Sequence, residues 1–173
     1  AKGDLLIKNF DPKLIKTELN LLKKVGAKIK LFKNSIHVKG PERIKSIRNI
    51  TTKEYPGFPT DLAPQFMVLL CKASGTSSIT ENIFQGRFLH AMELQRLGAK
   101  ITVKNRTANI EGNKNFIAAE VMSSDLRASA ALVLAGIVSK GNTIVTRVYH
   151  CDRGYENFEN KLKKIGVKIK RLK

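Results

Sequence analysis

The segment Gly26–Ile29 reads GAKI, and near copies of it return at Gly98–Ile101 (GAKI) and Gly166–Ile169 (GVKI). Each copy follows another glycine by 23 to 25 residues, and these earlier glycines are Gly3, Gly75 and Gly141. Self-similarity at a regular spacing is the signature of a repeated supersecondary unit. The chain of 173 residues is therefore predicted to contain three copies of one unit around a shared core.

Each copy has the local pattern of a strand, a helix, a hairpin and a second helix. In the first copy the strand covers Leu5–Phe10, and Asp11 followed by Pro12 indicates the start of a helix that ends at Gly26. The matching strands are expected at Ser78–Phe84 and Thr143–Tyr149, and the matching helices at Arg87–Leu97 and Gly154–Ile165. Hairpin turns are expected at Asn34-Ser35 and Asn105-Arg106, and second helices from Asp61 to Gly75 and from Asp125 to Gly141.

This order predicts a mixed α/β (α+β) fold and a single domain over residues 1–173, with units at about 1–50, 51–113 and 114–173. The first and last units are incomplete. Ala1–Gly3 matches only the end of a second helix, and Lys173 falls in the first arm of a third hairpin. Because the chain also lacks an initiator Met, we expect it to be a piece of a larger protein.

The charge balance points to an anionic partner. The chain carries 32 Lys and Arg against 14 Asp and Glu, a formal net charge of +18. Most lysines stand singly between apolar residues, as on solvated faces, and only Lys161–Lys173 approaches a basic cluster. The lysines are therefore interpreted mainly as a solvated surface, and nucleic acid is favoured less as the anionic partner than it would be by charge alone. A noncatalytic basic module that binds nucleic acid through Lys161–Lys173 stays as the alternative.

Several function classes are excluded by composition and spacing. The longest apolar stretch, Ala130–Val138, is too short to span a membrane, and two Cys cannot form a disulfide framework. We therefore expect a cytoplasmic protein. No metal-ligand spacing joins the three His, no cofactor fingerprint is present, and neither metal nor organic cofactor is expected. Cys71 reads as a buried core thiol and Cys151 as a bystander.

Two aspartates stand at matching places in successive units. Asp61 and Asp125 are 64 residues apart, and each lies at the predicted start of a helix. Either residue can cap its helix by accepting bonds from free backbone N–H groups. A carboxylate at the mouth of the fold can also act as a general base. The spacing leaves both roles open.

Three arginines lie at or beside predicted helix starts. Arg87, Arg127 and Arg153 are placed where free backbone N–H groups and a guanidinium together form a site for phosphate or carboxylate. A purely structural role, in which they pair with Glu93, Asp152 or Glu156, is the alternative. Their recurrence at equivalent positions favours the anion site.

Ordered motifs along almost the whole chain resemble the UDP-N-acetylglucosamine enolpyruvyl transferases, relatives of EPSP synthase. The motifs are Phe58–Leu62 (FPTDL), Ile79–Phe84 (ITENIF), Arg87–His90 (RFLH), Asp125–Ala130 (DLRASA) and Tyr149–Glu156 (YHCDRGYE). The resemblance implies a two-domain enzyme in which each domain is an inside-out α/β barrel of three βαβαββ-type units. This chain would be the C-terminal domain, with its first and last units incomplete.

The resemblance also implies an activity. These enzymes move the enolpyruvyl group of phosphoenolpyruvate to the 3′-hydroxyl of UDP-N-acetylglucosamine, releasing phosphate without metal or organic cofactor, as the first committed step of peptidoglycan synthesis. Asp61 matches the residue that deprotonates the hydroxyl, and Arg153 matches an arginine at the phosphoenolpyruvate end. Catalytic residues are thus expected at Asp61, Asp125 and Arg153, and substrate contacts at Asp61, Ile83, Phe84, Arg87, Leu126, Arg127 and Arg153.

Part of the family's machinery has no counterpart in this chain. The N-terminal domain supplies an Asn, a Lys and a mobile loop with a reactive Cys, and Cys151 does not match that loop. The chain alone is therefore expected to be inactive and to need the N-terminal domain as its partner. A relic half-protein that folds without activity is a further alternative.

Overall fold

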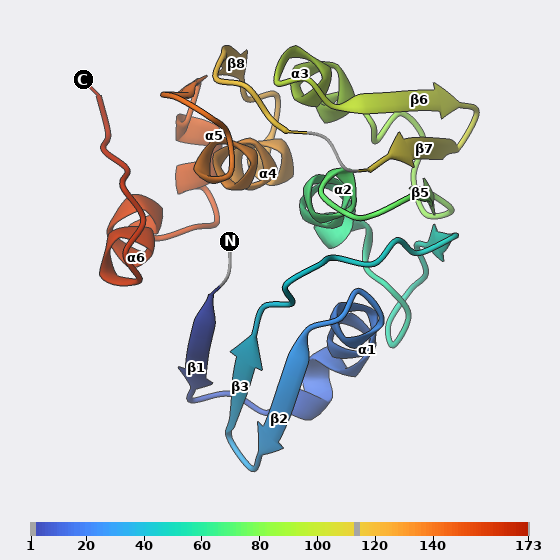
Figure 1. Ribbon diagram of the computed structural model, residues 1–173, viewed down its shortest axis with the longest axis vertical. Coiled ribbons are helices and arrows are strands. Elements are labelled where there is room, and N and C mark those ends of the chain that lie inside the picture. The colour runs from blue at the N-terminus through green and yellow to red at the C-terminus, as the bar shows by residue number, and fades with distance from the viewer. Residues whose placement is uncertain (1–2, 113–114, 173) are drawn as a thin grey trace.

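The computed structural model describes residues 3–112 and 115–172 as helices, strands and connecting loops that surround a pair of central helices (Figure 1). The expected helix end at Ala1 and Lys2, the unit boundary at 113–114 and the final Lys173 lie outside the described residues.

The first unit is a three-stranded antiparallel sheet with one helix. Strand β1 (Asp4–Lys8) leads through the turn η1 (Pro12–Ile15) into α1 (Lys16–Lys24), and β2 (Lys28–Phe32) and β3 (Ser35–Lys39) form a hairpin. The sheet order is β1-β3-β2. The predicted cap at Asp11 is confirmed, because its carboxylate accepts a bond of 2.9 Å from the backbone N–H of Lys13.

The second unit has the same strand arrangement. Helix α2 (Ala63–Cys71) follows β4 (Ile50–Thr51) and the turn η2 (Thr60–Leu62); then come β5 (Thr76–Thr80), α3 (His90–Arg96), β6 (Lys100–Lys104) and β7 (Thr107–Glu111). The sheet order is β4-β5-β7-β6, with β4 parallel to β5 and the other pairs antiparallel. The order β5-β7-β6 therefore repeats the order β1-β3-β2.

The third unit contains β8 (Glu120–Met122), α4 (Leu126–Ile137), β9 (Ile144–Thr146), α5 (Tyr149–Asp152) and α6 (Phe158–Lys164). Strands β8 and β9 pair in parallel, as β4 and β5 do in the preceding unit. In each parallel pair, one strand precedes and the other follows one of the two longest apolar helices, α2 or α4, along the chain.

Helices α2 and α4 pack against each other in the centre of the molecule, with the strands arranged around them (Figure 1). Met67 and Leu70 of α2 and Ala131 and Leu132 of α4 have no measurable exposure. A helix contacted on several sides must be apolar on several sides, which accounts for the sequences APQFMVLLC and LRASAALVLAGI. Residues of both helices belong to the hydrophobic core, together with buried residues of α3 and of the surrounding strands.

The mixed α/β fold class is confirmed. In the described residues the strands form three separate sheets, and no closed sheet joins them. The hairpin turn at Asn105-Arg106 is as predicted, whereas the first turn is at Lys33-Asn34, one residue earlier than predicted.

All three predicted strands end earlier than expected, and β1 stops at Lys8 rather than Phe10. Strand β5 stops at Thr80, because the Glu81 side chain accepts bonds from the backbone N–H groups of Ile83 and Phe84 and so bends the chain into a turn. Strand β9 stops at Thr146, because Arg147 has a φ of +55°, and α5 begins at Tyr149.

Several helices are also shorter in the structure than predicted from the sequence. The helix expected over Gly154–Ile165 begins only at Phe158, because Asn157 has a left-handed φ of +50°. Helix α3 begins at His90 rather than Arg87, and α2 and α4 stop before Gly75 and Gly141. Residues 167–172 form no strand, because no described segment pairs with them.

Gly112 lies at backbone contact distance from the segment that follows helix α2. Its N–H donates to the carbonyl of Gly75 (2.9 Å), and a Cβ at this position would lie 2.0 Å from the carbonyl oxygen of Ala73. The obstacle is backbone, which cannot rotate away as a flexible side chain can. Only glycine fits at this position.

We expect Gly112→Ala to lower the free energy of unfolding by about 3 kcal/mol, since the added methyl group must push two backbone segments apart. Urea denaturation followed by circular dichroism measures the change. Gly3→Ala is the matched control, because a Cβ on Gly3 meets no atom within 4 Å. Equal stability of the two variants would contradict the prediction.

Candidate functional site

One cluster of predicted site residues lies at the start of α4. Nη1 of Arg127 is 3.7 Å from Oδ1 of Asp61, and Nε of the same side chain is 3.2 Å from Oδ1 of Asp125. The Arg127 side chain is 17% exposed and that of Asp61 is 75% exposed. A half-buried guanidinium is thus held between two carboxylates, of which Asp61 projects into solvent. We call Asp61, Asp125, Leu126 and Arg127 the α4 cluster.

The capping prediction is confirmed for Asp125 and wrong for Asp61. Oδ1 of Asp125 accepts bonds from the backbone N–H groups of Arg127 (2.9 Å) and Ala128 (3.1 Å). At the start of a helix such N–H groups have no acceptor within the helix itself. Asp61 lies inside the turn η2 rather than before it, and neither η2 nor α2 has a side-chain cap. The two aspartates therefore differ: one is committed to its helix, and the other is not.

Arg153 lies next to a residue that packs on the α4 cluster. A Cβ on Gly154 would be 2.9 Å from Cδ2 of Leu126, and α5, which ends at Asp152, packs on α4. Arg153 is exposed and forms no ion pair within residues 3–112 and 115–172. The chain around Arg153 is thus beside the start of α4.

The alternative in which the three arginines pair with Glu93, Asp152 or Glu156 is not what the structure shows. Asp152 bonds to Arg171 at 2.9 and 2.6 Å, and Glu93 lies 3.7 Å from Arg96. Glu156 pairs with Lys161. The acidic residues proposed as structural partners are therefore paired with other cations.

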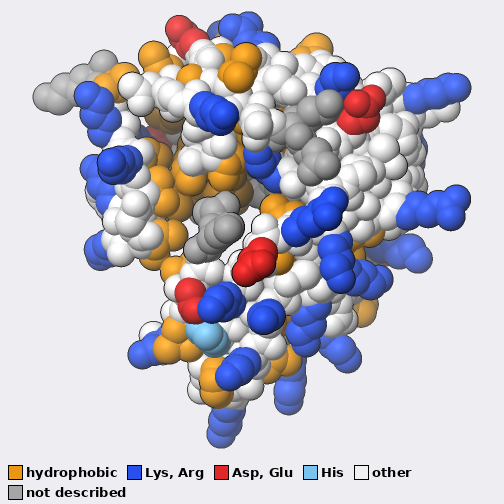
Figure 2. Space-filling model, in the orientation of Figure 1, with side chains coloured by type: hydrophobic (Ala, Val, Ile, Leu, Met, Phe, Trp, Pro, Cys, Tyr) orange, Lys and Arg blue, Asp and Glu red, His pale blue; other side chains and the backbone are white. Residues whose placement is uncertain are grey.

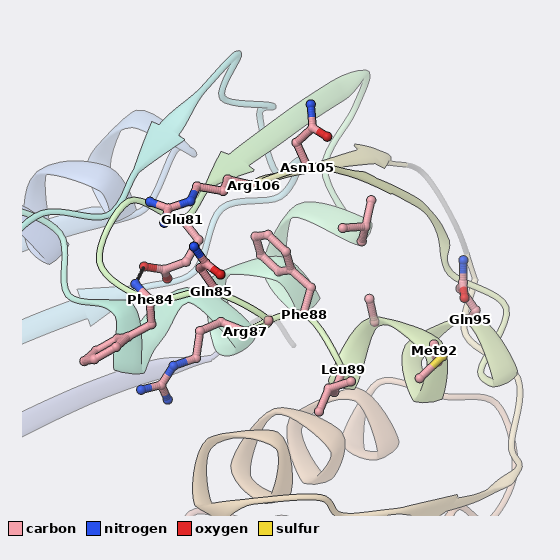
Figure 3. A pocket seen from close by; sticks show the side chains of 13 residues that line it. Glu81, Phe84, Gln85, Arg87, Phe88, Leu89, Met92, Gln95, Asn105 and Arg106 are labelled. Carbon is pink, nitrogen blue, oxygen red and sulfur yellow. Dashed lines mark hydrogen bonds between the residues drawn. The ribbon is translucent and has the colours of Figure 1, made fainter.

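A second cluster surrounds a pocket of about 640 Å³ between α3, the preceding loop and the β6–β7 turn (Figure 3). Phe84 and Arg87 line it, and the Arg87 guanidinium lies over the Phe84 ring at 4.1 Å. Such a cation–π contact holds the arginine in one direction. Asp61, Arg127 and Arg153 do not line this pocket. Ile83 precedes Phe84 but does not line the pocket. We call Ile83, Phe84 and Arg87 the loop cluster.

Glu81 joins the two clusters, and the sequence analysis did not identify it as a site residue. Its side chain is 1% exposed. Oε2 accepts from the hydroxyl of Thr60 (2.6 Å), the residue before Asp61, and Oε1 accepts from the N–H groups of Ile83 (2.7 Å) and Phe84 (3.1 Å). The signal available in the sequence was an acidic residue in the middle of the predicted strand Ser78–Phe84.

Burial and hydrogen bonding act in opposite directions on Glu81. Burial is the largest single influence and raises the pKa of the carboxyl group, but the bonds from Thr60, Phe84, Thr52 and Ile83 together lower it below the usual 4.5. The carboxylate is therefore ionised at neutral pH although it is enclosed.

His90 is a second buried titratable group between the clusters. It is 2% exposed, and its Nε2 has no hydrogen-bond partner. Burial lowers the pKa of the imidazole from 6.5 to about 4, against the opposing effects of the Asp125 charge and a bond to the Arg87 backbone. The ring is neutral at physiological pH, and it bonds to the Arg87 backbone in the loop cluster.

The described residues contain no group of three or more His, Cys, Asp and Glu side chains that could hold a metal ion. Within the same residues, none of the helices has both the length and the apolar character needed to cross a membrane.

A family model for EPSP synthase (3-phosphoshikimate 1-carboxyvinyltransferase) matches residues 1–162. The chain belongs to the EPSP synthase family. Among solved structures of this fold, the enolpyruvyl transferase NikO from Streptomyces tendae matches with a TM-score of 0.87 and 25% identity, covering 98% of this chain and 40% of that one. EPSP synthase from Acinetobacter baumannii matches with a TM-score of 0.78 and 18% identity, over 99% of this chain and 43% of that one.

Curated members of the EPSP synthase family are more similar in sequence. UDP-N-acetylglucosamine 1-carboxyvinyltransferase of Pelagibacter ubique is 57% identical over 172 residues, which cover 99% of this chain and 41% of the relative. The protein of the same name from Desulfosudis oleivorans is 50% identical over 172 residues, with the same coverage. The chain thus spans about 40% of the length of the curated relatives that it matches.

Asp125 caps a helix and Asp61 does not, and this difference can be measured as a change in the free energy of unfolding. We expect Asp125→Ala to lower the free energy of unfolding by about 1 to 2 kcal/mol, because two N–H groups of α4 lose their acceptor. Asp61→Ala, which removes only an exposed carboxylate, should stay within about 0.5 kcal/mol of the unchanged chain. Urea denaturation of both variants provides the measurement, and an equal loss at Asp61 would restore the capping role there.

The lowered pKa of His90 predicts a loss of stability in mild acid. Below pH 6.5 the imidazole binds a proton in the unfolded chain but not in the folded one, so the free energy of unfolding falls as the pH drops from 6.5 to about 4. The full loss from this residue is about 3 kcal/mol, at about 1.4 kcal/mol for each pH unit.

Comparison of the unchanged chain with His90→Asn isolates this effect, because asparagine keeps an N–H donor but does not titrate. Urea denaturation at several pH values between 7 and 4 should give a shallower pH dependence for the variant. Parallel curves for the two proteins would exclude His90 as the source.

Proposed function

We propose that this chain is the substrate-cleft part of an enzyme that transfers the enolpyruvyl group of phosphoenolpyruvate to the 3′-hydroxyl of UDP-N-acetylglucosamine. The observation that carries the proposal is the 57% identity, over nearly the whole chain, with a protein named UDP-N-acetylglucosamine 1-carboxyvinyltransferase. Identity with EPSP synthase from Acinetobacter baumannii is only 18%, which favours the sugar nucleotide over a shikimate-type acceptor. The α4 cluster supplies groups suited to this chemistry.

We propose a C-terminal domain built as an inside-out barrel of three units over residues 1–173, with boundaries near 50 and 113. The common order of β1-β3-β2 and β5-β7-β6 supports this arrangement, as does the central position of α2 and α4. In such a domain the starts of the central helices share one end of the fold. That end carries the α4 cluster.

Asp61 acts as the base in this proposal. Its carboxylate is exposed, caps no helix and lies near one guanidinium, so it can accept a proton from a bound alcohol. The alcohol oxygen then bonds to C2 of phosphoenolpyruvate, and C3 gains a proton from an acid of the completed active site. C3 next returns a proton to that acid while the bond between C2 and the phosphate oxygen breaks. The C2–C3 double bond forms again, and phosphate leaves with the proton that Asp61 took from the alcohol.

The arginines hold the anionic co-substrate. Phosphoenolpyruvate carries a phosphate and a carboxylate, and Arg127 and Arg153 are the cations at or beside the start of α4. Asp125 bonds to Nε of Arg127 and so leaves the outer guanidinium nitrogens directed toward Asp61. Asp125 therefore orients the arginine, while Arg87 serves the neighbouring loop cluster.

The sugar nucleotide contacts the loop cluster and Leu126. Phe84 is 46% exposed, which makes its ring available to a ligand surface. The Glu81 bonds to the N–H groups of Ile83 and Phe84 fix this loop relative to Asp61. The opposite wall of the cleft belongs to an N-terminal domain, the partner that completes the active site, and the chemistry needs no metal or organic cofactor.

The nucleic-acid alternative receives less support. Figure 2 shows Lys and Arg side chains spread over several parts of the visible face rather than gathered in one patch. At the basic end, Arg171 is already paired with Asp152 and Glu159. Binding that is lost on removal of residues 161–173 and falls steeply with salt would revive this alternative.

A chimeric enzyme tests the proposed function. The 172 matched residues of the Pelagibacter ubique relative are replaced by this chain, and phosphate release from phosphoenolpyruvate is measured with UDP-N-acetylglucosamine or shikimate 3-phosphate as acceptor. We expect phosphate release with UDP-N-acetylglucosamine as the acceptor and none with shikimate 3-phosphate. The 173-residue chain by itself should release no phosphate, because half of the proposed cleft is missing.

Within this chimera, Asp61→Asn should lower kcat at least about 100-fold, the range for loss of a general base, while UDP-N-acetylglucosamine binding by calorimetry changes little. Glu42→Gln is the matched control, because it makes the same acid-to-amide change at an exposed residue outside both clusters. Full turnover in Asp61→Asn would remove this residue from the base role.

A further inference from the structure

We propose that Glu81 is a positioning residue that fixes the Asp61 carboxylate relative to the loop cluster through the hydroxyl of Thr60. This role rests on the proposed function of Asp61 as the base. Glu81 is buried and is not proposed to touch substrate, so its influence on the reaction passes through the residues that it binds.

One oxygen of Glu81 holds the segment that carries the base. Oε2 accepts from Oγ1 of Thr60 at 2.6 Å, and Thr60 is both the first residue of η2 and the direct neighbour of Asp61. No side chain caps η2. The hydroxyl of Thr60 is therefore the side-chain link between this turn and the sheet that contains β5.

The other oxygen holds the loop cluster and the end of β4. Oε1 accepts from Oγ1 of Thr52 (2.8 Å) as well as from the N–H groups of Ile83 and Phe84. Thr52 in turn accepts from the N–H of Asn82 (2.8 Å). The backbone N–H of Glu81 donates to the carbonyl of Arg106 (2.7 Å) and so ties the centre of this network to the β6–β7 turn.

The chemistry of the network explains why a carboxylate stands at this position. Four donors converge on two oxygens, and an ionised carboxylate can accept all four, whereas an amide offers a single acceptor oxygen. No cation lies within ion-pair distance of Glu81 in the described part of the chain. A buried charge that is held only by neutral donors is expensive, which points to a geometric purpose beyond stability.

Loss of the Thr60 bond should therefore misplace the base without removing it. A displacement of about 1 Å at a reacting group can lower a rate by about 100-fold. The sugar-nucleotide contacts at Ile83 and Phe84 keep their own bonds to Oε1, so substrate binding should change less than turnover.

Three variants in the chimera separate positioning from general loosening. Thr60→Val removes the hydroxyl at nearly constant volume and should lower kcat by at least about tenfold, with the KM for UDP-N-acetylglucosamine changed less than threefold. Thr60→Ser keeps the hydroxyl and should restore kcat. Thr52→Val also removes a donor to Glu81, but on the β4 side, so it should lower kcat less than Thr60→Val even where its melting temperature falls further.

The same variants of the 173-residue chain provide a readout that does not depend on turnover. In carbon-detected NMR, the side-chain carboxyl resonance of Asp61 should shift in Thr60→Val and stay near its original position in Thr60→Ser and Thr52→Val. An unmoved Asp61 resonance in Thr60→Val overturns the positioning role, as does unchanged kcat in the active chimera. An inactive chimera with a shifted Asp61 resonance instead refutes the proposed function and leaves the link between Glu81 and Asp61 intact.

Discussion

The contact between helices α2 and α4 is the constraint on which the rest of the molecule depends. Both helices are apolar around most of their surface, so most of that surface must be removed from water. Part of it is buried where the two helices pack against each other. Asp61 precedes α2 and Asp125 precedes α4, and the ion pair of Arg127 with Asp61 shows that these two starts lie at the same end of the fold. Packing in the core thus brings together polar residues that are 64 positions apart in the chain.

The parts of the fold that were predicted correctly from the sequence rest on local signals. Glycine positions, the Asp11-Pro12 helix start and the Asn105-Arg106 turn follow from backbone preferences of a few neighbouring residues. Element ends were predicted less well. At Glu81 the chain turns because its side chain bonds to the backbone of the following residues, and at Arg147 and Asn157 it turns through a left-handed φ, which non-glycine residues adopt uncommonly.

The residues of the candidate site also fall into those that the sequence predicted and those that it did not. Asp61, Arg127 and Asp125 could be selected from their matching places and motifs, and they are in fact neighbours. Asp61 was also a reasonable cap from sequence, but a short turn precedes α2 and changes which residue stands at the helix start. Glu81 and His90 escaped notice because the importance of a buried polar group lies in its partners, and those come from β4, η2 and the start of α4.

The cap at Asp125 has a mechanical consequence. A single carboxylate oxygen bonds to two backbone N–H groups of α4 and to Nε of Arg127, so this guanidinium cannot swing independently of the helix. A force applied to this guanidinium would therefore act on helix α4 as a whole, and α4 packs against α2 and α5.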